Sequence, residues 1–465
     1  MPDHSAPPIV PSLGLLVSYL IIIWPVLYRW WSVLPAGYPR LPTGQLSGEA
    51  LAPAVCPACE AERLLHEQAK SWREPPPRIR QRRGRRRCID TSSHYCPNRG
   101  CAYYGWLGLG NLRANGHPNG GSWRQLACVV CHKTFLETIN TIFYRKQVKA
   151  ETIWQVLTSL AEGVGIRKTA RIFGLDPNTV QKWLHQAAQH MEAVSHYLIH
   201  DLHLTQVQVD ELWALLGKRT GEGRHKLWVW VGVDAKSKLW LATLIGDRSQ
   251  ACAQLLIHAI VLLLAPGCLP LFTSDQWSAY ACALLTHFGQ WVAIPRRSAR
   301  GRPPKPRWQA LPGLLYAQVV KHRLKGHVVS VTQRAVFGSL EAIETALKLS
   351  GVGQIINTAS IERLNLTIRQ HVAALGRKVS DLAKTIAGLQ DQLSLARAYH
   401  NFCLPHATLR LPLPQPQPTR GNGSPKQWQP RTPAMAAGVT NCIWRMEELL
   451  LLRIPPWRQD IVPAA

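Results

Sequence analysis

Hydrophobic and polar residues alternate over several short segments in the middle of the chain. The segment TQVQVDELW indicates a strand that begins near Thr205, and residues 226–246 (KLWVWVGVDAKSKLWLATLIG) have the pattern of a hairpin that turns at Asp234. Helical and strand-like runs then alternate, at 250–264, 269–274, 276–288 and 291–294. This order predicts an α/β fold whose central sheet opens with a three-stranded meander.

Two other regions follow a helical period. Between about residues 148 and 195 the pattern is helical, and one helix presents its apolar residues on a single face: Ile153, Trp154, Leu157, Leu160 and Ala161. A second, mostly helical segment runs from about 336 to 402. Residues 296–330, which precede it, are basic and broken by prolines, so they are expected to form an insertion in the sheet domain.

Residues 164–187 (VGIRKTARIFGLDPNTVQKWLHQA) have the pattern of a helix-turn-helix. Gly174 would supply the turn, and Asp176 would cap a second helix that begins at Pro177. The apolar positions of the first helix are Ile166, Ala170 and Ile172. The second helix would offer four polar side chains to the major groove of DNA: Asn178, Thr179, Gln181 and Lys182. An ordinary helical hairpin is the alternative interpretation.

The charge of the chain favours a polyanionic partner. Lysine and arginine number 54 against 27 acidic residues, which gives a formal net charge of +27. The excess is concentrated in two runs, RIRQRRGRRR at 78–87 and RRSARGRPPKPR at 296–307. A single charge run is often only a solvated tail, but two runs in so basic a chain indicate double-stranded DNA or another nucleic acid.

The N-terminal segment is apolar enough to allow two interpretations. No charged residue occurs between Ile9 and Tyr28, and Arg29 follows as an interfacial anchor would. A membrane span through residues 9–28 is therefore one expectation. Pro11 and Pro25 shorten the uninterrupted helix to about a dozen residues, which suits a buried or oligomer-forming helix instead.

Seven of the twelve cysteines lie between residues 56 and 131. Two close pairs, Cys96 with Cys101 and Cys128 with Cys131, are separated by a stretch of hairpin length, which is typical of a tetrahedral Zn²⁺ site of the ribbon type. Four buried thiols are the alternative. A second site is possible around the pair at 56 and 59. The absence of a convincing cleavable signal favours a reducing, cytoplasmic and nucleoid-associated location.

Acidic residues are scarce, and three of them have contexts suited to metal-dependent phosphoryl transfer. Asp210 ends the apolar alternation of its strand, and Asp275 ends the run LPLFTSDQW in the same way. Glu362 lies in the helical stretch TASIERLNLTIRQ. Two strand-end aspartates and a helical glutamate could converge on a pair of Mg²⁺ or Mn²⁺ ions, which prefer oxygen ligands. Glu211, next to Asp210, is expected to point to the opposite face of the strand.

Basic residues surround Glu362 and are expected to hold DNA. Arg369 is two turns beyond Glu362 on nearly the same helical face, a position suited to a phosphate contact. The other basic residues expected to contact DNA here are Arg363, Arg377 and Lys378.

Four segments carry a resemblance to a known family. DELW (210–213), WVWVGVDAKSKLWLATLIGDRS and SDQWSAY resemble the DDE transposases of bacterial insertion sequences, and NTASIERLNLTIRQHVAALGRK resembles the glutamate helix of the insertion-sequence-one-like family. The resemblance covers roughly residues 95–405. It implies a ribonuclease-H-like catalytic domain preceded by a zinc ribbon and a helix-turn-helix, with Asp210, Asp275 and Glu362 as the metal-binding triad.

The resemblance also implies a function and a domain organisation. The protein would bind the ends of an insertion sequence, cleave there and transfer the strands into target DNA as a homo-oligomer in a synaptic complex. A catalytically inactive DNA-binding regulator, or a decayed transposase, would share the same sequence features. The expected parts are an apolar segment (1–35), a linker with the arginine run (36–90), a zinc ribbon (91–147), a helix-turn-helix (148–200), a catalytic domain (201–405) and a Pro-rich tail (406–465).

Overall fold

The computed structural model describes residues 74–79, 89–217, 225–295, 305–324, 327–377, 382–419 and 423–459. All of them belong to the second of two units into which the chain divides, residues 53–465. The apolar segment at 9–28, the cysteines at 56 and 59, most of the arginine run and Lys378 lie outside the described residues. Among the residues that are described, no helix is long and apolar enough to cross a membrane.

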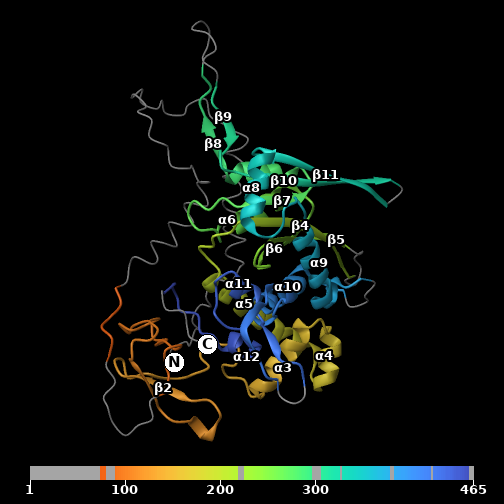
Figure 1. The fold of residues 1–465 in the computed structure, drawn as a ribbon. Coiled ribbons are helices and arrows are strands. Elements are labelled where there is room, and N and C mark those ends of the chain that lie inside the picture. The colour runs from red at the N-terminus through yellow and green to blue at the C-terminus, as the bar shows by residue number, and fades with distance from the viewer. Residues whose placement is uncertain are drawn as a thin grey trace, which may run out of the picture. The chain divides into compact units, whose positions relative to one another are not determined.

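A six-stranded mixed sheet is the centre of the described unit, in the order β11-β10-β7-β4-β5-β6 (Figure 1). Its strands are β4 (Gln206–Leu216), β5 (His225–Asp234), β6 (Trp240–Gly246), β7 (Leu271–Asp275), β10 (Tyr316–Leu324) and β11 (His327–Phe337). Strands β4, β5 and β6 form the antiparallel meander that the alternation predicts, and β7 and β10 continue the sheet in parallel to β4. The sheet therefore resembles that of the ribonuclease-H-like fold.

Helices cover both faces of this sheet because its central strands are apolar on both sides. They include α6 (Gln250–Val261), α7 (Ala279–His287), α9 (Ala359–His371) and α10 (Ile386–Ala398). Successive residues of β5 enter different cores: Trp230 packs with α6 and α7, whereas Val229 and Val231 pack with α9 and α10. Trp230 is fully buried. Truncation of such a side chain to alanine typically costs about 3–5 kcal/mol.

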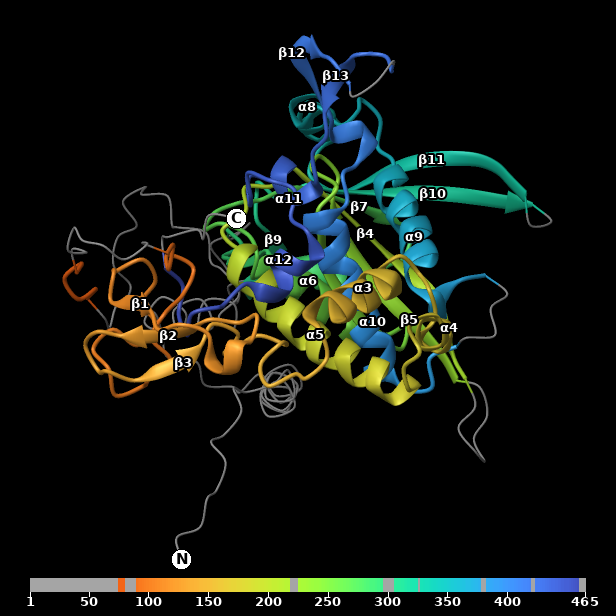
Figure 2. The ribbon, with the colours of Figure 1, turned by 90° about the horizontal axis from the view of Figure 1, so that it is seen from below.

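The fifth strand of the central sheet in chain order, β10, is not the strand at 291–294 that the sequence pattern predicts. The run at 291–294 corresponds to β8 (Gly289–Val292), which pairs with β9 (Arg307–Ala310) in a separate two-stranded sheet. Strand β10, inside the basic segment interpreted as an insertion, takes the predicted place. Its first residues are mostly apolar and buried. The outer part of the β10–β11 hairpin is exposed, combines basic residues with exposed valines, and extends beyond the other strands (Figure 2).

The cysteine-rich region forms a small module of its own. It contains a three-stranded sheet of β1 (Leu112–Ala114), β2 (Gln125–Cys128) and β3 (Thr134–Leu136), with the short helix η1 (Pro118–Gly120) between the first two strands. Its core is separate from the larger ones and includes Leu112, Leu126 and Phe135 beside the cysteines. Such a core is small, so a metal cross-link is the expected source of additional stability.

Three helices follow this module: α3 (Ala150–Ala161), α4 (Ile166–Phe173) and α5 (Pro177–Leu198). Gly174 ends α4 in the left-handed conformation, with φ of 64°, and its N–H donates to the carbonyl of Ala170. Asp176 caps α5, since its side chain accepts the N–H of Asn178 at 2.8 Å. The helix ends predicted from Gly174 and Asp176 are thus present. Ile172, however, is 67% exposed and does not belong to the packed face of α4.

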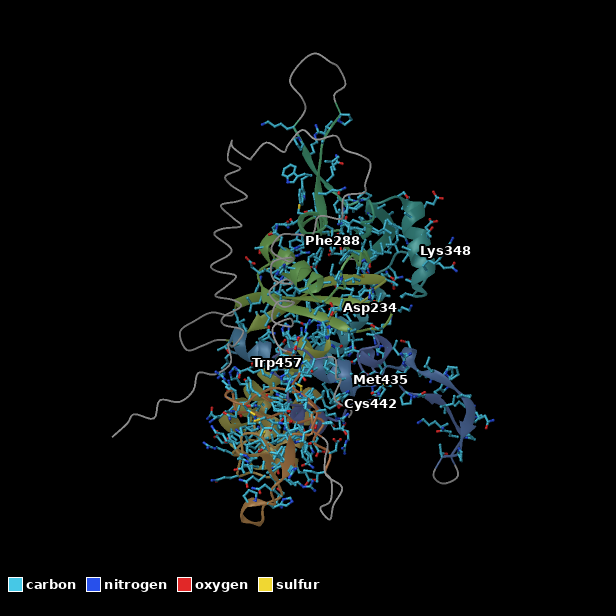
Figure 3. All side chains as sticks on the ribbon, turned by 90° about the vertical axis from the view of Figure 1, so that its left-hand side faces the viewer. Asp234, Phe288, Lys348, Met435, Cys442 and Trp457 are labelled. Carbon is cyan, nitrogen blue, oxygen red and sulfur yellow. The ribbon has the colours of Figure 1, made fainter. Side chains whose placement is uncertain are left out.

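The C-terminal residues contain regular elements, including two strands within the Pro-rich stretch 411–433, whose composition suggests a flexible linker. The elements between α7 and the end of the chain that remain to be named are α8 (Leu340–Ser350), η2 (Ala373–Leu375), η3 (Tyr399–Cys403), η4 (Ala407–Leu409), β12 (Leu411–Gln417), β13 (Lys426–Gln429), α11 (Pro433–Ala436) and α12 (Met446–Leu451). Trp444 and Leu449 are buried in the main core. Met435, Cys442 and Trp457 mark this C-terminal segment in Figure 3.

Candidate functional site

Asp210 and Asp275 are brought together by the parallel pairing of β4 with β7. The pairing joins Gln206–Gln208 to Leu271–Thr273 and matches Gln208 with Thr273, so each aspartate lies two residues beyond the last pair. Asp210 does not end its strand, because β4 continues to Leu216 while paired with β5. What ends near Asp210 is the contact with β7, and this leaves the edge of β4 open beside the two carboxylates.

Glu211 joins these two aspartates, which the sequence did not indicate. Carboxylate oxygens of Asp210, Glu211 and Asp275 all lie within 4.8 Å of one another. Glu211 is on the other face of β4, as alternation requires, and its oxygens accept hydrogen bonds from the Tyr280 hydroxyl at 2.8 Å and the Arg248 Nε at 2.7 Å. The open edge of β4 allows side chains from both faces of the strand to approach Asp275.

Glu362 lies near this group but makes different contacts. Its carboxylate pairs with the Lys321 ammonium of β10, accepts a hydrogen bond from Thr358 at 3.0 Å and is 50% exposed. These hydrogen bonds hold the pKa of Glu362 below its ordinary value, although partial burial opposes them. Asn365, not Glu362, makes the direct contact of α9 with the aspartates: its side-chain amide donates to Asp210 at 2.7 Å.

Helix α9 is fixed against β4 by a buried glutamine. The side chain of Gln208 donates to the carbonyl of Asn357 and accepts the N–H of Ile361, both at 3.0 Å. Gln208 is fully buried, and the loss of either bond would leave a polar group unsatisfied in the core. Because Gln208 precedes Asp210 by two residues on the same face, it sets the position of α9 relative to the carboxylates.

The electrostatics of the group are those of a cation site. Burial, together with the charges of Glu211, Asp275 and Glu362, raises the pKa of Asp210 to about 7. Burial and the charge of Asp275 also raise the pKa of Glu211. Crowded, partly buried carboxylates destabilise one another unless a cation neutralises them, and oxygen ligands of this kind suit Mg²⁺ or Mn²⁺. The donor set therefore fits a divalent metal ion.

Arg248 supplies part of the neutralising charge. Its guanidinium lies 5.0 Å from the ring centroids of both Trp228 and Trp277, and it forms an ion pair with Glu211. The same guanidinium is 3.9 Å from Asp275. The two indole rings restrict the guanidinium to this place through cation–π contacts. No sequence pattern reveals this arrangement, because the two tryptophans come from different elements.

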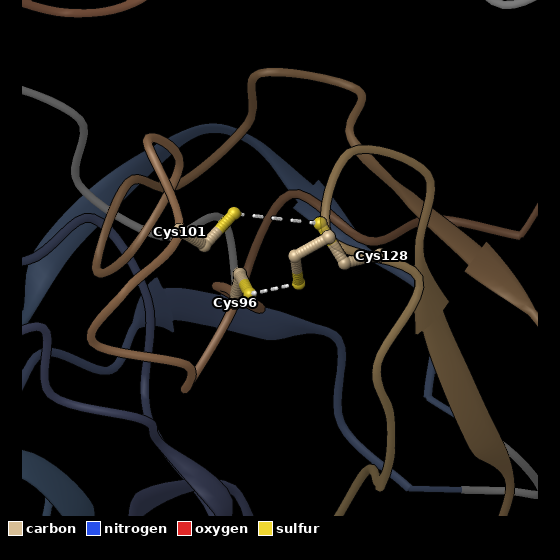
Figure 4. A group of neighbouring side chains, drawn as sticks. Cys96, Cys101 and Cys128 are labelled. Carbon is tan, nitrogen blue, oxygen red and sulfur yellow. Dashed lines mark hydrogen bonds between the residues drawn. The ribbon is translucent and has the colours of Figure 1, made fainter.

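The four cysteines of the small module have the geometry of a zinc site. Their sulfurs lie within 4.8 Å of one another, with Cys96 to Cys131 at 3.7 Å and Cys101 to Cys128 at 3.9 Å (Figure 4). A tetrahedral ion with Zn–S bonds of about 2.3 Å separates its sulfurs by about 3.8 Å. Asn111 donates to the Cys128 sulfur at 3.5 Å, as expected for a group that orients a thiolate ligand. The four residues fit Zn²⁺ as the sequence predicts.

Comparison with known proteins gives no family assignment. No protein-family model and no curated protein matches the chain. Among solved structures, the crystal structure of the Mos1 strand transfer complex is similar over 30% of this chain and 55% of that one, with 12% sequence identity and a TM-score of 0.12. The chain thus spans about half the length of that structure's chain. A TM-score this low does not establish a common fold.

The side chains predicted to contact DNA lie in different environments. On α5, Asn178, Gln181 and Lys182 are exposed, and Thr179 is half-buried. Near α9, Arg363 and Arg377 are exposed.

Arg369 differs from these residues because it is partly buried and donates to the carbonyl of Leu375 at 3.3 Å. Its contact is thus with the backbone at the end of η2, where a cation satisfies a carbonyl group.

Proposed function

We propose that this protein is a metal-dependent DNA transposase of the DDE type, which cleaves at the ends of an insertion sequence and transfers the strands to target DNA. The observation that carries the proposal is the convergence of Asp210 and Asp275 at the open edge of β4, with a pKa of about 7 at Asp210. Crowding of this kind at the edge of a mixed sheet is unfavourable for folding, so it indicates a functional site.

In this proposal Asp210 and Asp275 hold Mg²⁺ or Mn²⁺, and Glu362 is the third member of the triad. Bound metal ions would stabilise the attacking and leaving oxygens of the phosphodiester. Asn365 orients Asp210, and Arg248 holds Glu211 beside the pair. Lys321 neutralises Glu362 in the metal-free protein and would be released to a DNA phosphate when Glu362 turns to the metal.

The remaining modules would bind DNA. Helices α4 and α5 would act as a helix-turn-helix, with Asn178, Thr179, Gln181 and Lys182 in the major groove. The net charge of +27, with Arg363 and Arg377 exposed beside the acidic group, supports phosphate contacts. The zinc module would help to recognise the element ends, and pairing of two ends implies a homo-oligomer.

The test is a cleavage and strand-transfer assay with purified protein, DNA that carries the terminal repeats flanking its gene, and Mg²⁺. We expect D210N, D275N and E362Q each to reduce cleavage at least about a thousandfold, because a lost metal ligand removes several kcal/mol of transition-state stabilisation. DNA binding should be retained. E344Q, which changes an exposed glutamate on α8, is the matched control and should cleave normally.

Cleavage by D210N or D275N at the wild-type rate would refute the proposal. Wild-type protein that binds the end DNA but leaves it intact with Mg²⁺ and with Mn²⁺ would favour the other candidate, a DNA-binding protein without catalytic activity.

A further inference from the structure

A cavity of about 300 Å³ lies on the other side of α9 from Asn365 and Asp210. It is open to solvent on one side and lined by the turn between β5 and β6, by α9 with the segment before it, and by the segment that follows α10. None of the described residues that line it is acidic. Apart from the amide of Asn357, its polar lining is basic or carries hydroxyl groups: Lys238, Ser360, Arg363, Thr367, His400, His406 and Thr408.

Lys238 is held in the wall of this cavity. Its ammonium donates to the carbonyl of Ala235 at 2.5 Å and to the hydroxyl of Ser360 at 2.9 Å, so one of its three N–H donors is left for a ligand. Burial lowers its pKa, and the charge of Asp234 opposes this effect. The Asp234 carboxylate itself accepts hydrogen bonds from the backbone and hydroxyl of Ser237. The lysine therefore has no direct ion pair among the described residues.

Three further basic residues line the same space: Arg363, His406 and the buried His400. Arg363 is exposed, and no acidic residue in the described part of the chain forms an ion pair with its guanidinium. Burial, followed by the charges of Lys238 and Arg363, lowers the pKa of His406. Lys238 and Arg363 thus bring two positive charges to one cavity, beside an imidazole whose lowered pKa disfavours its own charge. Such an arrangement is unfavourable in the free protein and becomes favourable when an anion occupies the cavity.

We propose that this cavity binds a phosphate group, and that in the DNA complex the group is a backbone phosphate of the bound strand. The proposal rests on the proposed function for its DNA source, but the chemistry is that of any phosphate. Hydroxyl donors, an ammonium and a guanidinium are the groups that proteins use for phosphate oxygens. A cavity of this volume also leaves room for the adjoining sugar.

The position of the cavity gives the phosphate a second effect. Ser360, Arg363 and Thr367 share one face of α9, whereas Glu362 and Asn365 face the acidic group. A phosphate bound by Ser360, Arg363 and Thr367 would restrain α9, and the same helix carries Glu362 and Asn365 on its other face. Binding of the strand would thereby be coupled to the placement of the residues beside Asp210.

The experiment compares the variants K238M and R363M with K236M, whose exposed side chain lies in the same turn but outside the cavity. Inorganic phosphate binding is measured by titration calorimetry, and binding of an end-DNA duplex by fluorescence anisotropy over a range of salt concentrations. We expect the two cavity variants to bind inorganic phosphate about tenfold more weakly. We also expect each to lower the slope of the salt dependence of DNA binding by about one.

Weaker binding of both ligands supports a backbone phosphate, whereas weaker binding of inorganic phosphate alone supports a cavity for the free ion. If K238M and R363M match K236M in both measurements, the proposal is wrong. Thermal unfolding of each variant checks the fold, and R363M keeps the test valid if K238M is unstable. The calorimetric arm needs no DNA cleavage, so its outcome is independent of whether the protein is a transposase.

Discussion

Asp210 lies in an environment that disfavours its ionised form. Its pKa of about 7 in the folded protein is above the ordinary 3.8, because burial and the neighbouring carboxylates disfavour its charge. The folded protein therefore holds a proton that the unfolded chain releases. The contribution of this proton to the free energy of unfolding is fully present below pH 3.8, and it is lost as the pH rises through about 7.

From this we expect D210N to stabilise the metal-free protein at pH 8 but not at pH 3.5. A tenfold change in proton affinity is worth about 1.4 kcal/mol, so the gain at pH 8 should be on the order of a few kcal/mol. Thermal unfolding in the presence of a chelator, at several pH values, measures it. An unchanged pH profile in D210N would show that Asp210 is not the titrating group.

Arg248 is the cation that pairs with Glu211 beside the two aspartates. We expect R248M to destabilise the metal-free protein by on the order of 2 kcal/mol, because the Glu211 side chain, only 2% exposed, loses its ionic partner. The stability of R248K should lie between that of R248M and that of the wild type, since lysine keeps the charge but lacks the stacked guanidinium. Mg²⁺ should restore more stability to R248M than to the wild type. Equal stabilisation of both by Mg²⁺ in a thermal unfolding series would contradict this role.

Sequence patterns could identify some of these residues and not others. Asp210 and Asp275 each follow an apolar run, so their positions on two strands are visible without a structure. Glu211 is assigned to the other face by the same alternation. The pairing of β7 with β4 stops after Gln208, and this allows Glu211 to approach Asp275. Where the pairing stops depends on tertiary structure. Arg248 has no local signal, because its two tryptophan contacts are long-range.

At the scale of elements, the zinc module offers a prediction that is independent of catalysis. We expect C128S to lose bound zinc and to unfold the module, because its core is too small to be stable without the metal. Elemental analysis of purified protein and near-ultraviolet circular dichroism measure the two effects. C282S removes an exposed, free thiol and is the control. Full zinc content in C128S would exclude the four-cysteine site.

The meander, the helices on either side of it and the turn at Gly174 were predictable because each has a local pattern. Strand β10 was not, since its buried half is followed directly by an exposed, basic half in the same hairpin. The C-terminal elements were hidden in a similar way. The proline content of residues 411–433 suggests a linker, although β12 and β13 pair there, and Trp444 and Leu449 beyond this stretch are buried in the core.

At the scale of the whole described unit, the C-terminal segment joins the zinc module to the helices. Trp457 packs edge-on against Tyr104 and Trp106 of the module, with ring centroids 5.9 and 5.4 Å apart. The Arg453 guanidinium donates to the carbonyl of Glu137 at 2.6 Å. In the same segment, the carbonyl of Leu449 lies 2.9 Å from a ring nitrogen of His190 in α5. The module with the four-cysteine site and the helix proposed to contact DNA thus both contact one C-terminal segment.

The central claim is that Asp210 and Asp275 bind the catalytic metal, and Mn²⁺ in a crystal tests it most directly. An anomalous difference map from crystals grown with Mn²⁺ should show a peak at about 2.1–2.2 Å from an oxygen of each aspartate, in the range of metal–oxygen bonds. It would also show whether Glu211 or Glu362 completes the site. Mn²⁺ bound elsewhere, with no peak between Asp210 and Asp275 at saturating concentration, would contradict the account.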